Sequence, residues 1–165
     1  MGTRSTIIAK LSNGQTKRIY CHWDGYPENN GALLLNHYQE QAKIDALIEL
    51  GDLSSLGQEI GEQHAFDDRS HENWTTAYGR DRGETGIEAR RVKSLPHAIK
   101  ASAECGAEFV YLWDGDKWSI TTPEGGVIHP LREFMAIHSG LALTQTVKAF
   151  GGNFKIGTKT ATATE

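Results

Sequence analysis

The alternation of apolar and polar residues at the start of the chain predicts a β-hairpin. Residues 6–11, "TIIAKL", are apolar and rich in β-branched side chains, and residues 16–23, "TKRIYCHW", alternate in polarity. Between them lies Asn13-Gly14, a dipeptide that is a strong signal for a hairpin turn. Residues 108–122 alternate in the same way on both sides of the turn "DGDK" and predict a second hairpin.

Helical periodicity follows the first hairpin. Apolar side chains recur over residues 34–38 and again over residues 44–48, but the two stripes are out of phase with each other. We therefore expect two short helices with a break near Gln39-Glu40. Asn30 is expected to cap the first helix, and Gly51 to end the second.

Two more helices are predicted in the second half of the chain. Ser94 is a suitable N-cap, Pro96 suits a first helical turn, and Gly106 suits a C-terminal stop. Residues 129–150 are also predicted to be helical, with an interruption at Gly140.

Residues 52–88 are polar and rich in glycine, and they show little periodicity. Loops this long inside a compact domain are usually functional or disordered. Phe66, Trp74 and Tyr78 favour order, because disordered segments contain few bulky aromatic residues. We predict an α+β fold with a single domain over residues 1–150, in which helices cover one face of an antiparallel sheet built from the two hairpins. Residues 151–165 form a Gly/Thr-rich C-terminal tail.

Composition limits the classes of partner. The chain has 165 residues, 38% of them hydrophobic, and a formal net charge of -4, which argues against duplex nucleic acid or an anionic membrane as partner. There is no apolar run of the length that a membrane span needs. Two cysteines are too few for a disulfide scaffold, so a reducing cytoplasm is the expected location. No cofactor motif is present, and we expect no cofactor.

The stretch "YCHWDGYP" is the first candidate site. His22 and Asp24 share one face of the predicted strand and could form an imidazole–carboxylate pair for catalysis. Cys21 is an alternative nucleophile, although its neighbour His22 points to the opposite face. Trp23 and Tyr26 could contact a ligand. In the competing interpretation Cys21 and Trp23 are core residues, and Asp24 only makes the turn.

The second candidate site is "WTTAYGRDRGE". Arg80 and Arg82 carry planar groups of donors that suit phosphate or carboxylate, and Trp74 and Tyr78 offer ring faces for a base. Alternatively, the two arginines pair with nearby acidic residues in a solvated loop. Together the two stretches give one predicted ligand-binding set, which consists of Trp23, Tyr26, Trp74, Tyr78, Arg80 and Arg82.

A metal site is a weaker alternative. Histidine and aspartate residues recur within "HAFDDRSH", and this combination suits zinc or manganese. The spacing matches no standard ligand pattern, so we predict no metal and keep as the alternative set His64, Asp67, Asp68 and His71.

The sequence resembles a family of small uncharacterised proteins from tailed phages and prophages. The pattern that carries the resemblance is Thr3-Arg4-Ser5, then "YCHWDGYP", "GDLSSLG" at residues 51–57 and "YGRDRGE" at residues 78–84. It covers roughly the first 115 residues. The resemblance implies a phage accessory gene that is expressed in the bacterial host cytoplasm, and it transfers no catalytic residue.

Three functions remain open at this point. The protein could be an accessory factor, for example a counter-defence factor, that binds a small anionic or nucleotide-like ligand without turnover. It could instead be a small hydrolase or phosphodiesterase using His22 and Asp24, or a protein inhibitor of a host factor. A homo-oligomer is compatible with each of them.

Overall fold

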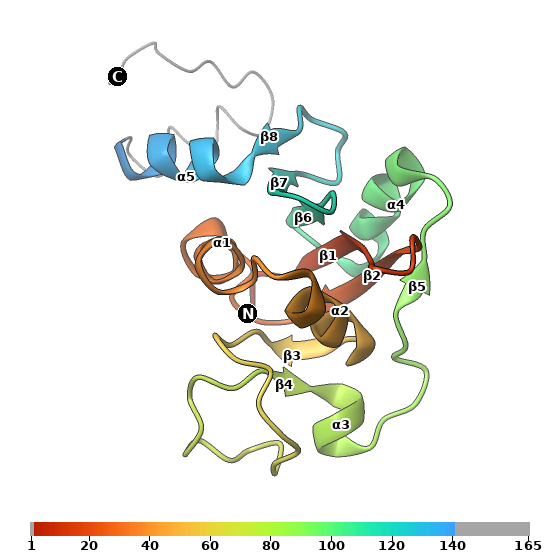
Figure 1. The fold of residues 1–165 in the computed structure, drawn as a ribbon, viewed down its shortest axis with the longest axis vertical. Helices are drawn as coiled ribbons and strands as arrows, with labels where there is room; N and C mark the ends of the chain where they lie inside the picture. Colours follow the sequence, from red (N-terminus) through yellow and green to blue (C-terminus); the bar gives the residue numbers. More distant parts are fainter. Residues whose placement is uncertain (1, 141–165) are drawn as a thin grey trace.

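The computed structural model describes residues 2–140, and it forms a single α+β domain. One sheet runs through it in the order β4-β3-β2-β1-β6-β7-β8, with β5 paired to β2 as well (Figure 1). Within the described part of the chain, no helix is long and apolar enough to cross a membrane. The strands are β1 Ser5–Lys10, β2 Thr16–Cys21, β3 Leu53–Ser55, β4 Thr76–Ala77, β5 Arg90–Arg91, β6 Phe109–Trp113, β7 Trp118–Thr121 and β8 His129–Pro130. The helices are η1 Pro27–Gly31, α1 Ala32–His37, α2 Gln41–Glu49, α3 Tyr78–Arg82, α4 Leu95–Ala101, η2 Ser102–Cys105 and α5 Leu131–Gly140.

Both predicted hairpins are present. β1 and β2 pair antiparallel around the Asn13-Gly14 turn, and Gly14 has φ 88°, a conformation that glycine adopts without strain. β6 and β7 form the second hairpin, and the Asp114 carboxylate accepts backbone N–H bonds from Asp116 and Lys117 in its turn. Local turn chemistry therefore determines both units.

The two hairpins are joined through the parallel pair β1–β6, which has no signal in the sequence pattern. Ser5 pairs with Phe109 and Ala9 with Trp113, so two strands that are far apart in the sequence lie side by side. β2 and β3 are parallel as well, joined at Cys21 and Leu53. The sheet is therefore mixed rather than purely antiparallel.

The larger part of the core lies between one sheet face and the helices α1, α2 and α5. Alternate residues of the central strands, such as Ile7, Ile19 and Tyr111, are fully buried there. The break predicted near Gln39-Glu40 separates α1 from α2 and lets each helix turn its own apolar stripe toward the sheet.

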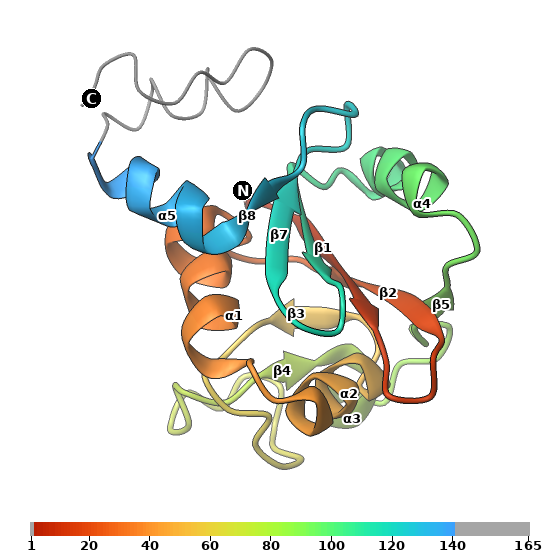
Figure 2. The same cartoon turned by 45° about the horizontal axis from the view of Figure 1, so that its top comes forward.

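Helices cover both faces of the sheet, not one as predicted. α4 lies on the side opposite α1 (Figure 2), where Ala98 and Ile99 pack on Ile8, Val110 and Leu112. The Ser94 hydroxyl caps α4 by accepting the His97 N–H, as predicted. This second layer has no clear sequence signal, because α4 has only two buried apolar positions.

Residues 52–88 are ordered and complete one end of the sheet. They contribute β3, β4 and α3, which lie at the bottom of Figure 1 with the connecting loops around them. Phe66 stacks on Tyr78 with ring centroids 5.7 Å apart, and Trp74 stacks on His71 at 3.9 Å. The aromatic residues therefore order this segment, as predicted, but its two- and three-residue strands are too short to produce a pattern.

The predicted cap at Asn30 is wrong. Asn30 is fully buried within η1, and its side-chain amide donates to Ser5 Oγ at 3.2 Å and Cys21 Sγ at 3.5 Å. It therefore ties η1 to the sheet instead of starting a helix. The predicted helix beyond residue 140 and the tail 151–165 lie outside the described residues.

Candidate functional site

The first sequence cluster lies where β2 ends and the chain leaves the sheet. The His22 and Trp23 backbone N–H groups donate to Leu53 and Ser54 of β3, and Asp24 then takes φ 55°. This left-handed conformation makes Asp24 a turn residue, as in the competing interpretation. Trp23 is 43% exposed, so the prediction that it could be a core residue is wrong.

The catalytic alternatives do not assemble in this cluster. His22 Nδ1 lies 2.6 Å from the Tyr20 hydroxyl, and within residues 2–140 no ion pair joins His22 to Asp24. Burial and the positive charge of Arg4 lower the pKa of His22. Cys21 is fully buried, and burial raises the pKa of its thiol to about 11. The thiolate that a nucleophile requires is therefore strongly disfavoured.

We expect the two cysteines to differ sharply in reactivity. Cys105 is exposed at the end of η2, whereas Cys21 is buried. Iodoacetamide in native buffer should alkylate Cys105 and leave Cys21 unmodified until the protein is denatured. Mass spectrometry of tryptic peptides measures both sites, with Cys105→Ser as the control. Rapid alkylation of Cys21 in the folded Cys105→Ser variant would contradict this burial and restore the nucleophile interpretation.

The second cluster places Arg80 inside the protein instead of on its surface. Its Nη1 donates to the Ile60 carbonyl at 2.8 Å, and its Nη2 donates to the Thr75 carbonyl at 2.6 Å. Its Nε and Nη2 also donate to the two carboxylate oxygens of Asp81, at 2.9 and 3.1 Å. All three nitrogens thus have internal acceptors, which gives Arg80 a structural role in holding the loop.

Asp81 is the centre of this arrangement. Its carboxylate also accepts the backbone N–H groups of Ala77 at 2.8 Å and His64 at 3.1 Å. Burial alone would raise the pKa of Asp81, but the hydrogen bonds from Arg80, Ala77 and His64 outweigh it and hold that pKa below its ordinary value.

The remaining aromatic and histidine residues of the segment pack on one another. The Arg82 guanidinium pairs with Glu84 and lies over the rings of Phe66 and Tyr78, at 4.3 and 5.0 Å from their centroids. The Trp74 ring face is covered by His71. Of the predicted ligand-binding set, Trp23 and Tyr26 are exposed, and Arg82 retains a partly exposed side chain.

The alternative metal set does not form. His64 contacts the Glu62 carbonyl and the Thr76 hydroxyl, and the Asp68 carboxylate accepts both the N–H and the hydroxyl of Ser70. Throughout the described residues, no group of three or more His, Cys, Asp or Glu side chains is arranged to hold a metal ion.

A different cluster of arginines surrounds a cavity on the sheet face that carries α4. The cavity has a volume of about 410 Å³, and we call it the arginine pocket. Arg18 of β2 pairs directly with Arg90 of β5, so the two side chains leave the sheet next to each other. Arg4 precedes β1, and a Cβ atom on Gly106 would lie 3.0 Å from its Nη1. The complete lining is Arg4, Thr6, Arg18, Tyr20, Asp52, Arg90 and Cys105.

The lining of this pocket contains one carboxylate, that of Asp52, and this carboxylate is hydrogen-bonded to Arg90. Arg90 Nη1 and Nη2 donate to the two oxygens of Asp52 at 2.8 and 3.0 Å, and the Tyr20 N–H also donates to Asp52 at 2.9 Å. Arg18 Nη1, in contrast, is buried and has no hydrogen-bond partner. The Tyr20 hydroxyl lies 2.6 Å from His22 Nδ1, and the nearby positive charge of Arg4 acts to lower the pKa of Tyr20.

This pocket could not be identified from the sequence, because its arginines are distant in the chain and isolated from one another. One sign was present: Arg18 and Tyr20 share the strand face that also carries His22. Only the pairing of β5 with β2, formed by two residues, brings Arg90 beside them.

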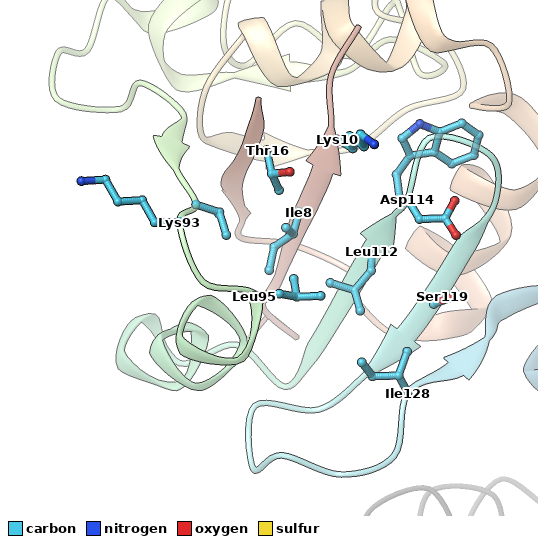
Figure 3. Close-up of a pocket in the computed structure, with 11 residues that line it drawn as sticks. Ile8, Lys10, Thr16, Lys93, Leu95, Leu112, Asp114, Ser119 and Ile128 are labelled. Atoms are coloured by element: carbon cyan, nitrogen blue, oxygen red, sulfur yellow. The ribbon is translucent and has the colours of Figure 1, made fainter. Parts of the chain in front are cut away.

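A second cavity on the same face has a different chemistry. This apolar cleft, shown in Figure 3, has a volume of about 370 Å³ and lies between β1, β6, β7 and the start of α4. Ile8, Leu112, Leu95 and Ile128 point into it. Its lining includes Lys10 and Lys93 but no arginine, so it offers no planar guanidinium group for bidentate binding, and the arginine pocket is the better phosphate site of the two.

The chain matches no known protein family, no curated protein and no solved structure.

Proposed function

We propose that this protein binds a small phosphate-bearing, nucleotide-like ligand in the arginine pocket and does not turn it over. The observation that carries the proposal is Nη1 of Arg18, which is buried and has no hydrogen-bond partner. Arg18 stands directly opposite Arg90 in the antiparallel pair of β2 and β5. Guanidinium groups bind phosphate with strong, often bidentate hydrogen bonds.

The arrangement is unfavourable without such a ligand. Like charges placed directly opposite each other in an antiparallel pair destabilise a sheet. A buried donor without an acceptor costs about 1–3 kcal/mol, and more when it is charged. The only carboxylate among the lining residues is already bound to Arg90, so it does not compensate Arg18. An anion between Arg4, Arg18 and Arg90 would remove both penalties.

The proposal keeps the ligand class expected from the sequence and changes the residues that hold it. The guanidinium nitrogens of Arg80 are bonded to acceptors within the protein, so we assign phosphate binding to Arg18 and Arg4 instead. Binding without turnover is supported by the burial of Cys21 and by the lack of an ion pair between His22 and Asp24 within the described residues. By the phage resemblance, we further propose that the protein acts in the bacterial host cytoplasm as a counter-defence factor that sequesters a nucleotide signal.

Thermal melting of the wild-type protein with a panel of mono-, di- and cyclic nucleotides tests the proposal. A ligand at about 100 times its Kd adds about 2.7 kcal/mol of stability, which corresponds to a shift of several degrees. Arg18→Met keeps the apolar stem but removes the charge. We expect this variant to lose the ligand-induced shift while its ligand-free Tm stays equal or rises, because a repulsion has been removed.

Arg91→Met is the matched control, because Arg91 is exposed on the same strand as Arg90 and does not line the pocket. It should retain the full shift. A ligand shift that persists in Arg18→Met would move the site elsewhere. No shift with any nucleotide would favour the protein inhibitor, and consumption of the ligand would favour hydrolysis by His22 and Asp24.

A further inference from the structure

The charges around the arginine pocket are unequal. Arg4, Arg18 and Arg90 contribute three positive charges, and the lining contains one carboxylate, Asp52. The bidentate contact with Asp52 pairs the charge of Arg90. Arg4 and Arg18 have no ion pair within the described residues, so two positive charges remain without a counter-charge.

We infer that the ligand group in the arginine pocket is a dianion, and specifically a terminal phosphate monoester instead of a phosphodiester. The inference rests on the proposed function and narrows its ligand class. A monoester carries close to two negative charges at neutral pH and has three terminal oxygens. It therefore matches the two uncompensated guanidinium groups in charge and offers each of them an acceptor. A diester carries one charge and two free oxygens, and would leave one group unmatched.

The other ionisable groups near the phosphate are few. Tyr20 stands on β2 between Arg4 and His22, Cys105 closes the η2 side, and Glu88 precedes β5 near Arg90. Burial raises the pKa of Tyr20, so its hydroxyl stays neutral and can donate a hydrogen bond. His22 lies behind Tyr20, and its pKa is lowered mainly by burial, so it is neutral at pH 7.5.

Calorimetric titration with a matched ligand pair tests the inference. A nucleoside 5′-monophosphate and its 3′,5′-cyclic form share base and sugar, but only the first is a monoester. At pH 7.5 we expect the monoester to bind at least about ten-fold more tightly, since it adds a second charge close to the two guanidinium groups. Ribose 5-phosphate, which lacks the base, should retain the preference over the cyclic nucleotide if the phosphate is the group recognised.

The pH dependence supplies an independent measurement. The second pKa of a phosphate monoester is about 6, so at pH 5.0 only about a tenth of it is dianionic, and its affinity should fall about five- to ten-fold relative to pH 7.5. Sulfate remains a dianion over this range. Its affinity should stay level, and any change in it would report protonation of His22 or another protein group.

The outcomes separate this inference from the proposed function. If the monoester and the cyclic nucleotide bind equally through Arg18, the pocket binds phosphate but the dianion inference is wrong. If neither ligand, orthophosphate nor sulfate binds, the proposed function itself fails. In Arg4→Met, which keeps Arg18 as the one uncompensated arginine, the preference for the monoester should fall to less than about three-fold; an unchanged preference would also overturn the inference.

Discussion

Replacing Asp81 by asparagine is expected to lower the free energy of unfolding by about 3 kcal/mol. The Asp81 side chain is fully buried and accepts hydrogen bonds from Arg80, Ala77 and His64. Asparagine has nearly the same shape, but it removes the charge that compensates Arg80. Loss of one partner from a buried ion pair typically costs about 3–5 kcal/mol. The upper end is not expected, because Arg80 keeps its two carbonyl acceptors.

Asp68→Asn is the control for this variant. Asp68 lies in the same segment, but its side chain is 31% exposed and its bonds to Ser70 are local. We expect a much smaller loss of stability than for Asp81→Asn, as for most surface polar groups. Urea denaturation followed by fluorescence measures both variants against wild type. Equal losses would show that the Asp81 network does not stabilise the domain.

Acid titration adds a second readout for Asp81. Because its pKa in the folded protein lies below the unfolded value of about 3.9, the ionised carboxylate stabilises the fold above that value. The contribution is lost as the pH falls through the folded pKa. The stability of the wild-type protein should therefore fall more steeply below about pH 4 than that of Asp81→Asn.

Replacing Gly51 by alanine is expected to destabilise the protein by about 2–5 kcal/mol. Gly51 follows α2 with φ 78°, where a side chain costs about 1–2 kcal/mol. A Cβ atom there would also lie 2.3 Å from the carbonyl oxygen of Ile87, which accepts the Asp52 N–H. Because the clashing atom belongs to the backbone, the clash is removed only if the segments around Gly51 and Ile87 move apart. Overpacking of this kind adds about 1–3 kcal/mol to the destabilisation.

Gly83→Ala separates the two contributions. Gly83 follows α3 with φ 72°, close to the angle of Gly51, but a Cβ atom at this position would have no neighbour within 4 Å. This variant should show the backbone strain alone, about 1–2 kcal/mol. Thermal or urea unfolding of the two variants gives the difference. If Gly83→Ala were as unstable as Gly51→Ala, the close approach of Ile87 would have no energetic consequence.

The parts of the fold that follow from local sequence were predictable. Both hairpins, the helix capped by Ser94 and the break between α1 and α2 each have a turn residue or a change of periodicity nearby. The parallel joining of β1 to β6 has no such signal, because long-range pairing depends on which apolar faces fit together. β3, β4 and β5 are too short for any periodicity to appear.

The candidate site was less predictable than the fold. "YGRDRGE" has the composition of an anion-binding loop, but Arg80 finds its acceptors in the carbonyls of Ile60 and Thr75, and backbone acceptors cannot be read from residue types. Arg4, Arg18 and Arg90 are each ordinary surface arginines when the sequence is read alone. They form a candidate site because they outnumber the carboxylates around them. This imbalance of charge can be seen only when the pairing of the strands is known.

The parallel pair β1–β6 also has a consequence for how the chain folds. Its strands are about a hundred residues apart in sequence, so bringing them together has a large entropic cost of loop closure. The contacts between the strands offset this cost only after both hairpins have formed. During synthesis the first hairpin can form early, but one edge of β1 stays unpaired until β6 leaves the ribosome. An open apolar edge is a template for aggregation. β1, with its buried run from Ser5 to Ala9, is therefore the segment where the nascent chain is most vulnerable to aggregation.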